Sequence, residues 1–340
     1  MSPQPARPFS RREFLGGLTL AGTAGLLGLR LGSVGAEPPP ETRTLKLVEV
    51  FGICIAPQRV AEELLRREGF NDVQYAEKEG ISGIRTALAS GEADISMQFA
   101  APLIMALDAG DPILLLAGGH AGCFELFGSD RVRTIRDLKG KTVAVPELGI
   151  GEHIFIASMV AYVGLDPHKD ITIVAHSPAD SMRLLSEGKI DAYMAFPPDS
   201  QELRAKRIGH VLINSMIDRP WSQYFCCLVA ANREFVRKRP VAVNRALRAI
   251  LRAADICARE PERAARFLVD KGVAANYDFA VQLMKDIPYD KWREYDPEDT
   301  VRFYALRLQE AGMIKAIPQK IISQGTDWRF LNALKKELKE

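Results

Sequence analysis

The sequence predicts an α/β protein with two lobes of similar build and a helical C-terminal region. Short apolar strands alternate with amphipathic helices in two separate series along the chain. Strands joined by helices of about ten residues are typical of parallel sheets with right-handed crossovers. Two long extended stretches, 122–128 and 223–230, follow the two series, and charged helices fill the chain from residue 234 onward. We therefore expect two sheets connected by two hinge strands.

The first 36 residues are predicted to be an export signal outside the fold. Arg11 and Arg12 precede an apolar stretch, 15–31, that five glycines dilute. A membrane-spanning helix needs about 20 strongly apolar residues, so this stretch is poorly suited to an anchor. Residues 34–36 (VGA) then offer the small side chains of a signal-peptidase site. The pattern resembles a twin-arginine signal peptide, so we expect the twin-arginine export machinery as a partner and the periplasm as the location.

The alternation of polar and apolar residues predicts the positions of the individual strands and helices. In the first series we expect strands at 45–50, 72–75, 93–97 and 113–117, and helices at 57–67, 81–89 and 102–108. In the second series we expect strands at 141–145, 171–174, 192–196 and 211–214, and helices at 152–163, 178–186 and 201–206. The C-terminal helices are expected at 242–258, 261–269, 278–285, 297–310 and 327–338.

These elements predict a division of the chain into lobes. The first lobe comprises 44–122 and 229–340, because the long helical tail is expected to pack back on the first series. The second lobe comprises 128–222. The segments 123–127 and 223–228 are expected to be paired strands that cross between the lobes as a hinge.

Charge and cysteine content exclude several kinds of partner and site. The leader carries a net charge of +3 and the remainder −1, so we predict no nucleic-acid partner. The five cysteines form no Cys-x-x-Cys pair and no spaced Cys/His array, so no redox motif or structural zinc site is indicated. As an alternative, Cys54, Cys123 and Cys226 would meet His120 near the cleft as soft-metal ligands, although no spacing supports it. We expect buried cysteines, no metal and no cofactor, and one or two disulfides are allowed in the periplasm although no spacing indicates them.

A two-lobed α/β protein binds its ligand where the carboxyl ends of strands meet the amino ends of helices. That rule predicts ligand-binding residues in the loops at these ends. In the first lobe they are Gly52, Ile53, Cys54, Ser82, Gln98, Phe99 and His120. In the second lobe they are Gly149, Ile150, Gly151, Glu152 and His153, and Phe196, Trp221 and Tyr224 are expected to close the cleft.

The chemistry of these loops indicates binding and not catalysis. Glycines before a helix, as at Gly149 and Gly151, expose backbone amides that favour an anion, although they also serve as simple turns. Glu147 and Glu152 oppose an anion and suit a ligand with donor groups or positive charge. The sequence contains no Gly-x-Ser-x-Gly elbow, His-Glu-x-x-His helix, Walker loop or dinucleotide fingerprint. We therefore expect no catalytic residues.

Several segments carry a resemblance to a known family. They are 87–95 (ALASGEADI), 109–112 (AGDP), 137–145 (DLKGKTVAV), 164–167 (GLDP) and 185–192 (LSEGKIDA). In this order they resemble the solute-binding proteins of the nitrate/sulfonate/taurine type, a group that includes relatives similar to thiamine-pyrimidine synthesis proteins. The resemblance covers about 45–258 and implies a type II periplasmic-binding-protein fold. It also implies a monomer that delivers a small molecule to the permease and ATPase of an ABC importer. The backbone amides near Gly151 are expected to bind a polar or anionic end of this molecule, and the aromatic residues a flat or apolar part.

Two alternatives to an importer receptor remain at this point. A binding protein of the same build can instead report its ligand to a membrane kinase or chemoreceptor. A pyrimidine-forming or metal-dependent enzyme is the other alternative. Relatives that act as enzymes carry a cysteine-rich iron motif, which is absent here, and the export signal also argues against this reading.

Overall fold

The computed structural model describes residues 37–50, 52–78 and 80–338, so the predicted leader, 1–36, lies outside the described residues. From Pro39 onward the chain forms one compact unit that contains two five-stranded sheets. We call each sheet, with the helices that cover it, a lobe. Within the described residues, no helix combines the length and apolarity needed to cross a bilayer.

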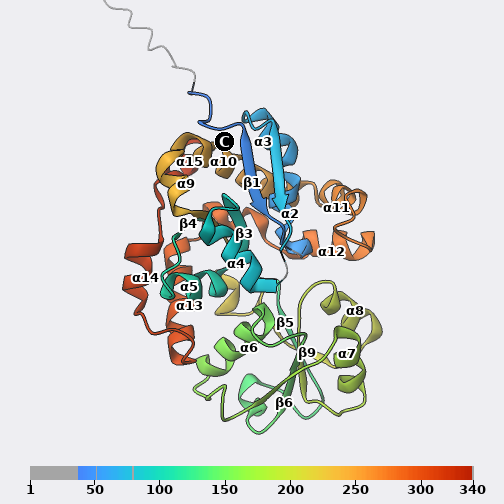
Figure 1. The fold of residues 1–340 in the computed structure, drawn as a ribbon. Coiled ribbons are helices and arrows are strands. Elements are labelled where there is room, and N and C mark those ends of the chain that lie inside the picture. The colour runs from blue at the N-terminus through green and yellow to red at the C-terminus, as the bar shows by residue number, and fades with distance from the viewer. Residues whose placement is uncertain (1–36, 51, 79, 339–340) are drawn as a thin grey trace, which may run out of the picture. The chain divides into compact units, whose positions relative to one another are not determined.

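The sheet of the first lobe has the strand order β2-β1-β3-β10-β4 (Figure 1). Its strands are β1 (Thr44–Val48), β2 (Asp72–Ala76), β3 (Ile95–Phe99), β4 (Ile113–Ala121) and β10 (Phe225–Asn232). Strand β1 is parallel to β2 and β3, whereas β10 runs antiparallel to β3 and β4. All residues of β3, β4 and β10 are buried, as is usual for apolar strands covered on both faces.

The sheet of the second lobe has the equivalent order β7-β6-β8-β5-β9. Its strands are β5 (Glu125–Gly128), β6 (Thr142–Val145), β7 (Thr172–Ala175), β8 (Ala192–Ala195) and β9 (His210–Asn214). Strand β5 is antiparallel to β8 and β9. The parallel pairing predicted for strands that helices separate is found for β1 with β2 and β3 and for β6 with β7 and β8. Strands β5 and β10 are antiparallel to their neighbours, because each enters its sheet directly after the chain arrives from the other lobe.

Two segments, 122–124 and 215–224, carry the chain between the sheets. The stretches predicted to form a pair of hinge strands do not pair with each other, since β5 and β10 each belong to one sheet. The crossings are instead joined at Ser215, whose hydroxyl accepts hydrogen bonds from the N–H groups of Cys123 (3.1 Å) and Phe124 (2.9 Å). The lobe bounds given above stay a prediction.

Helices fill the connections between strands. In the first lobe they are η1 (Ile53–Ile55), α2 (Ala56–Val60), α3 (Glu62–Arg67), α4 (Gly80–Ser90) and α5 (Ala100–Asp108). In the second lobe they are η2 (Ile135–Leu138), α6 (Gly151–Tyr162), α7 (Pro178–Ser186) and α8 (Asp199–Lys206), and η3 (Trp221–Gln223) lies in the second crossing. A smaller core that includes Phe127, Tyr193 and Leu203 lies within the second lobe, apart from the main core.

The C-terminal region is helical, as predicted. It comprises α9 (Arg233–Lys238), α10 (Pro240–Arg259), α11 (Pro261–Asp270), α12 (Tyr277–Asp286), η4 (Tyr289–Arg293), α13 (Pro297–Glu310), α14 (Pro318–Gly325) and α15 (Arg329–Glu337). Helix α10 packs on α2 and α3, so the predicted return to the first lobe is confirmed. Helix α13 contacts α5 and also α6, so the tail additionally reaches the second lobe. Figure 1 shows α13 and α14 in orange and red beside α5.

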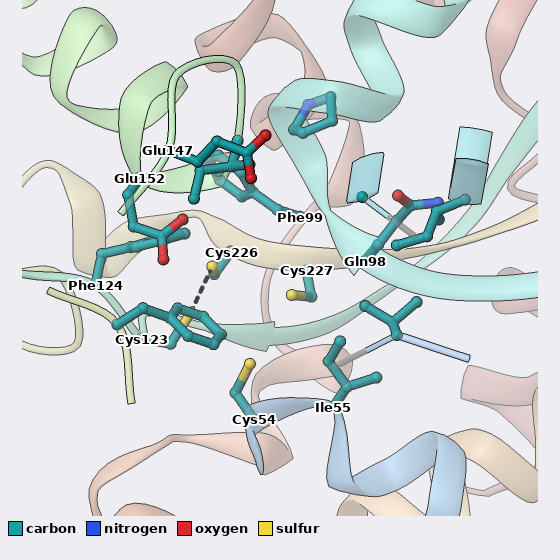
Figure 2. Close-up of a pocket in the computed structure, with 17 residues that line it drawn as sticks. Cys54, Ile55, Gln98, Phe99, Cys123, Phe124, Glu147, Glu152, Cys226 and Cys227 are labelled. Carbon is teal, nitrogen blue, oxygen red and sulfur yellow. Dashed lines mark hydrogen bonds between the residues drawn. The ribbon is translucent and has the colours of Figure 1, made fainter. Parts of the chain in front are cut away.

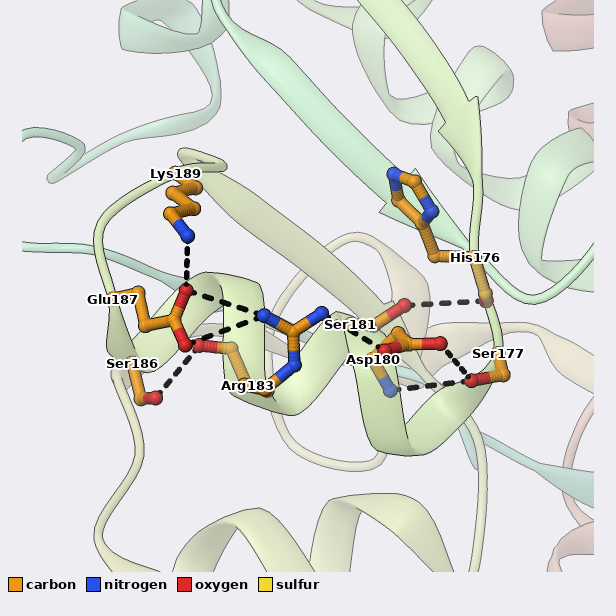
Figure 3. Close-up of polar contacts among 8 residues, drawn as sticks. All are labelled: His176, Ser177, Asp180, Ser181, Arg183, Ser186, Glu187 and Lys189. Carbon is orange, nitrogen blue, oxygen red and sulfur yellow. Dashed lines mark hydrogen bonds and ion pairs between the residues drawn. The ribbon is translucent and has the colours of Figure 1, made fainter.

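Local capping explains why α7 begins where the sequence predicts (Figure 3). The hydroxyl of Ser177 accepts a hydrogen bond from the backbone N–H of Asp180 (3.2 Å), and Pro178 occupies the first helical turn. Along the exposed face, Arg183 pairs with Asp180 (2.9 Å) and with Glu187 (3.3 Å). The cap satisfies one of the N–H groups that a helix start leaves without an intrahelical partner.

Removing this cap is expected to destabilise the protein moderately. Ser177→Ala should lower the free energy of unfolding by about 1 kcal/mol, because an N-cap hydroxyl contributes about that much. Ser186→Ala is the matched control, since that exposed hydroxyl donates only to the carbonyl of Arg183 at the other end of α7. Urea denaturation followed by circular dichroism measures both variants. Equal losses in the two variants would contradict the assigned cap.

Candidate functional site

A pocket of about 390 Å³ lies between the carboxyl ends of strands from both sheets (Figure 2). From the first lobe it is lined by Val50, Cys54, Ile55, Gly80, Ile84, Gln98, Phe99, Pro102, Cys226 and Cys227. From the first crossing and the second lobe it is lined by Cys123, Phe124, Glu147, Ile150, Gly151, Glu152 and Phe196. Its position agrees with the rule that ligands bind outside the carboxyl ends of strands in α/β sheets.

Three phenylalanine rings form an aromatic wall of the pocket. The ring centroids of Phe99 and Phe124 lie 5.0 Å apart, and those of Phe124 and Phe196 lie 5.3 Å apart. Behind them, Phe155 stacks on Phe124 at 4.7 Å. Phe99 comes from β3, Phe124 from the crossing and Phe196 from the end of β8, so the wall joins both lobes. Rings held by such neighbours present a preformed face to a flat or apolar ligand.

Glycine lets the start of α6 lie close to this wall. A β-carbon on Gly151 would lie 3.3 Å from the ring of Phe124 and 3.6 Å from that of Phe99. Gly149 has φ +89°, and its N–H donates to Nδ1 of His153 (2.9 Å). His153 therefore turns toward its own loop. The Gly-x-Gly pattern lets the start of α6 approach the aromatic wall closely.

Glu152, in the first turn of α6, has a strongly shifted pKa. Burial raises the pKa of its carboxyl group to about 7, and the negative charges of Asp199, Cys54 and Cys226 act in the same direction. A hydrogen bond from its own backbone N–H opposes this rise. The carboxylate thus already occupies the positive end of the helix dipole, where an anionic ligand would otherwise bind. Glu147 adds a second, exposed carboxylate to the same wall.

Four cysteines and one histidine meet at the side of the pocket. Figure 2 shows the sulfur atoms of Cys54, Cys123, Cys226 and Cys227 gathered together. The Sγ atoms of Cys123 and Cys226 lie 3.0 Å apart. The ligand atoms of Cys54, His120 and Cys123 all lie within 4.8 Å of one another. All five cysteines of the chain are buried, as predicted, and all five are free.

The thiols and His120 shift one another's pKa values. Hydrogen bonds donated by the Cys123 and Cys227 thiols lower the pKa of Cys54 well below its ordinary value. Burial alone would lower the pKa of His120, but its interaction with the Cys54 sulfur raises that pKa instead. The two pKa shifts have opposite directions and both favour the charged form of their group, a pattern typical of reactive or metal-binding sites.

The structure brings several of the predicted ligand-binding residues to the pocket wall. These are Cys54, Gln98, Phe99, Ile150, Gly151, Glu152 and Phe196. Gly52 lies next to them, because a β-carbon there would be 3.2 Å from the ring of Phe196. His120 lies behind Cys54 and is completely buried. A role of these residues in ligand binding stays a prediction.

Other predicted residues lie away from the pocket wall. Ile53 is buried in the core, Ser82 is exposed on α4, and Gly149 and His153 bond each other. Trp221 is 1% exposed and packs edge-on against Phe155 and Tyr162, whereas Tyr224 stacks on Phe303 with 4.0 Å between ring centroids. The aromatic residues expected to close the cleft thus serve packing in these two cases, because α13 supplies a ring against which they bury.

Ile55 belongs to the same predicted loop as Cys54, and nine further residues of the wall were not among the predicted ligand-binding residues. They are Val50, Gly80, Ile84, Pro102, Cys123, Phe124, Glu147, Cys226 and Cys227. The rule that ligands bind in the loops at the carboxyl ends of strands had indicated the loops that contain Cys123 and Glu147, but not these two residues themselves. Nothing local distinguishes Cys226 and Cys227, which lie inside β10 and enter the site because that strand runs between β3 and β4.

Comparison with known sequences gives two findings. A family model described as NMT1/THI5 like matches residues 66–264. The chain is also 27% identical over 237 residues to the 4-amino-5-hydroxymethyl-2-methylpyrimidine phosphate synthase THI13 of Saccharomyces cerevisiae. That match covers 65% of this chain and 66% of the yeast protein, so the chain spans just under two-thirds of this relative.

Comparison with solved structures identifies the fold. The nitrate-binding protein NrtA of Synechocystis PCC 6803 superposes with a TM-score of 0.68 at 16% identity, covering 88% of this chain and 90% of NrtA. The aliphatic sulphonate binding protein SsuA of Escherichia coli gives 0.64 at 18% identity, covering 80% and 86%. The predicted resemblance and the two-lobed periplasmic-binding-protein fold are thus confirmed.

Proposed function

The chain belongs to the NMT1/THI5-like family, and on that premise we propose that it is a periplasmic receptor that delivers a small molecule to an ABC importer. The observation that carries the proposal is the pocket between the lobes, with walls from both sheets and an aromatic surface that spans the two. Lobes joined by only two crossings can close over a ligand, and contacts made only in the closed state then favour closure.

The composition of the pocket wall supports a particular class of ligand. Among the described residues that line it, there is no lysine, arginine or histidine, whereas Glu147, Glu152 and Gln98 supply acceptor oxygens. An anion would meet two carboxylates and no cation, which is electrostatically unfavourable. We therefore favour a flat, uncharged or cationic molecule that bears hydrogen-bond donors, such as an aminopyrimidine, over nitrate or a sulfonate. The rings of Phe99, Phe124 and Phe196 would bind its flat face.

The cellular role follows from the leader and from the fold. The export signal predicted over residues 1–36 would carry the chain to the periplasm through the twin-arginine machinery. There the loaded receptor would dock, as a monomer, on a permease driven by an ATPase. The solved structures that share the fold are named as nitrate-binding and sulphonate-binding periplasmic proteins, which supports the same role.

Ligand binding can be measured directly on protein that has been refolded to remove bound molecules. 4-Amino-5-hydroxymethyl-2-methylpyrimidine is expected to raise the melting temperature, because a ligand at 100 times its dissociation constant adds about 2.7 kcal/mol of stability. Nitrate and taurine are expected to have no effect. At pH 8, where Glu152 is ionised, Glu152→Gln should weaken pyrimidine binding by about tenfold or more, since a hydrogen bond to a charged acceptor is lost.

Glu187→Gln is the matched control for this measurement. Glu187 lies on the exposed face after α7, where it pairs with Arg183 and Lys189, so its replacement should leave binding unchanged. Stabilisation by nitrate or taurine alone would contradict the proposed ligand class. Failure of every compound, together with no ligand-dependent compaction in solution scattering, would contradict the receptor itself.

A pyrimidine-forming enzyme is the second candidate, because the yeast relatives are named as pyrimidine phosphate synthases. The two functions differ in the fate of the bound molecule. A receptor releases its ligand chemically unchanged, whereas an enzyme forms product in proportion to time and protein concentration. Mass spectrometry of the molecules released after prolonged incubation therefore separates the two candidates.

A further inference from the structure

We infer that Cys54, His120 and Cys123 form a binding site for one thiophilic d¹⁰ metal ion, Zn²⁺ or Cu⁺, at the wall of the pocket. The site shares Cys54 and Cys123 with the wall of the proposed ligand pocket, but metal binding is measured separately from ligand binding, so each proposal can fail without the other. The three residues come from η1, from the end of β4 and from the first crossing. Only the tertiary structure places them together.

Geometry is the first support for this site. The two Sγ atoms and a ring nitrogen of His120 lie within 4.8 Å of one another. Ligands around one zinc ion at about 2.3 Å for sulfur and 2.1 Å for nitrogen lie closer together than that, so small side-chain rotations suffice. All three side chains are at most 1% exposed, which shields a bound ion from exchange with solvent.

The hydrogen bonding of His120 is the second, independent support. Its Nδ1 is 3.0 Å from the carbonyl oxygen of Gly122 and 3.3 Å from that of Ala121. Its Nε2 is completely buried and has no hydrogen-bond partner among the described residues. Histidines that bind metals usually donate the other ring N–H to a backbone carbonyl, which fixes the tautomer and the ring orientation. The hydrogen bond from Nδ1 of His120 to a backbone carbonyl is therefore the one that orients a metal-binding histidine, and Nε2 remains available for the ion.

The chemistry of the donor set is the third support. A buried thiolate is costly unless a positive charge lies beside it, and a metal ion bound by Cys54 and Cys123 would supply that charge. Binding would release the protons of the thiols to solvent. Thiolate and imidazole ligands select Zn²⁺ and Cu⁺, whereas Mg²⁺ and Ca²⁺ require oxygen ligands.

The neighbouring thiols bear on the fourth coordination position. Two thiolates on one tetrahedral zinc ion lie about 3.8 Å apart, given the usual zinc–sulfur distance. The Sγ atoms of Cys226 and Cys123 lie 3.0 Å apart, so Cys226 would have to rotate away from Cys123 to become the fourth ligand. Cys54, Cys123, Cys226 and Cys227 all line the pocket, so the ion would lie at the pocket wall. The fourth ligand would be one of the two thiols of β10 or a water molecule from the pocket.

The test is a metal titration of the full-length chain, reduced with a phosphine and stripped with a chelator. Under anaerobic conditions, Zn²⁺ and Cu⁺ are titrated separately in competition with chromophoric chelators. Co²⁺ serves as a spectroscopic probe. We expect one equivalent of Zn²⁺ or Cu⁺ to bind, and a thiolate-to-cobalt charge-transfer band with Co²⁺. Cys54→Ser, Cys123→Ser and His120→Asn should each weaken binding by about 10-fold to 100-fold or more, because each removes one direct ligand.

Cys257→Ser is the matched control. Cys257 is buried in α10 and lies outside the thiol cluster, so its replacement should leave metal affinity unchanged. Circular dichroism establishes that each variant is folded. Reduced, folded protein that binds neither ion, or ligand variants that bind as tightly as the parent, would overturn the inference. Metal binding without pyrimidine binding would support this site and count against the proposed receptor ligand, so the two failures are distinguishable.

Discussion

Glu152→Gln is expected to stabilise the protein at pH 8 and to leave its stability almost unchanged at pH 4. The reason is that the fold holds this carboxyl group protonated up to about pH 7, whereas the unfolded chain releases the proton near its ordinary pKa of 4.5. Above pH 7 the folded protein must carry a partly buried negative charge beside Asp199 and the thiols of Cys54 and Cys226. Glutamine removes that charge.

The sign follows from proton linkage. Between pH 4.5 and about 7 the folded state binds more protons than the unfolded state, so stability falls as the pH rises. Below this interval Glu152 is protonated in both states. Above it Glu152 is ionised in both states, and the folded protein has lost the full stability that the raised pKa costs. A pKa shift of this size lowers the free energy of unfolding by as much as about 3 kcal/mol. Thermal unfolding at several pH values should therefore show a gain of about 5 °C for the variant at pH 8.

Glu152→Asp provides the control, because it keeps an ionisable carboxyl group at the same position. It should retain the decline of stability with rising pH that the glutamine variant loses. If the parent protein and Glu152→Gln show parallel pH profiles, the unfavourable ionisation assigned to Glu152 is wrong. The same pair of variants also tests whether this carboxylate accepts a hydrogen bond from the pyrimidine.

Gly122→Ala is expected to lower the free energy of unfolding by about 3 kcal/mol or more. Gly122 lies in the first crossing with φ +61°, a conformation that costs other residues about 1 kcal/mol. A β-carbon there would also lie 2.5 Å from Cα and 2.7 Å from the backbone nitrogen of Met216 in the second crossing. Because backbone atoms cannot rotate away, the two crossings would have to separate, and such overpacking costs a further 1–3 kcal/mol or so.

Gly272→Ala separates the two contributions. Gly272 has φ +71°, yet a β-carbon there would meet nothing within 4 Å. Its replacement should therefore cost only the conformational part, about 1 kcal/mol. Urea denaturation of the two variants measures the difference. Equal losses would show that the close approach of the crossings at Gly122 and Met216 does not constrain the fold.

The local pattern of the chain was sufficient to locate most elements. The predicted helices 178–186 and 297–310 coincide with α7 and α13, because a proline fixes the first turn of each and Ser177 or Asp296 caps it. The loop rule also located the pocket, since Gln98, Phe99 and Gly151 follow strands or open a helix. Helices α9 and α14 were not predicted, because eight residues or fewer carry little periodicity.

Long-range contacts decided what the local pattern left open. Trp221 and Tyr224 look equally suited to a cleft and to a core, and only the ring of Phe303 in α13 assigns them to packing. The direction of β5 and β10 likewise depends on the route that the chain takes between lobes.

By itself, the sequence determined the α/β class, the order of the elements and the loops that surround the pocket, because hydrophobic periodicity, caps and turns act over a few neighbouring residues. Only the tertiary structure decided that Cys54, His120, Cys123 and Cys226 share one site. These residues lie far apart in the sequence, so no short motif contains them and no local pattern predicts their site. Their meeting depends on the approach of η1, β4 and β10 across the first lobe, which is set by the packing of the whole sheet.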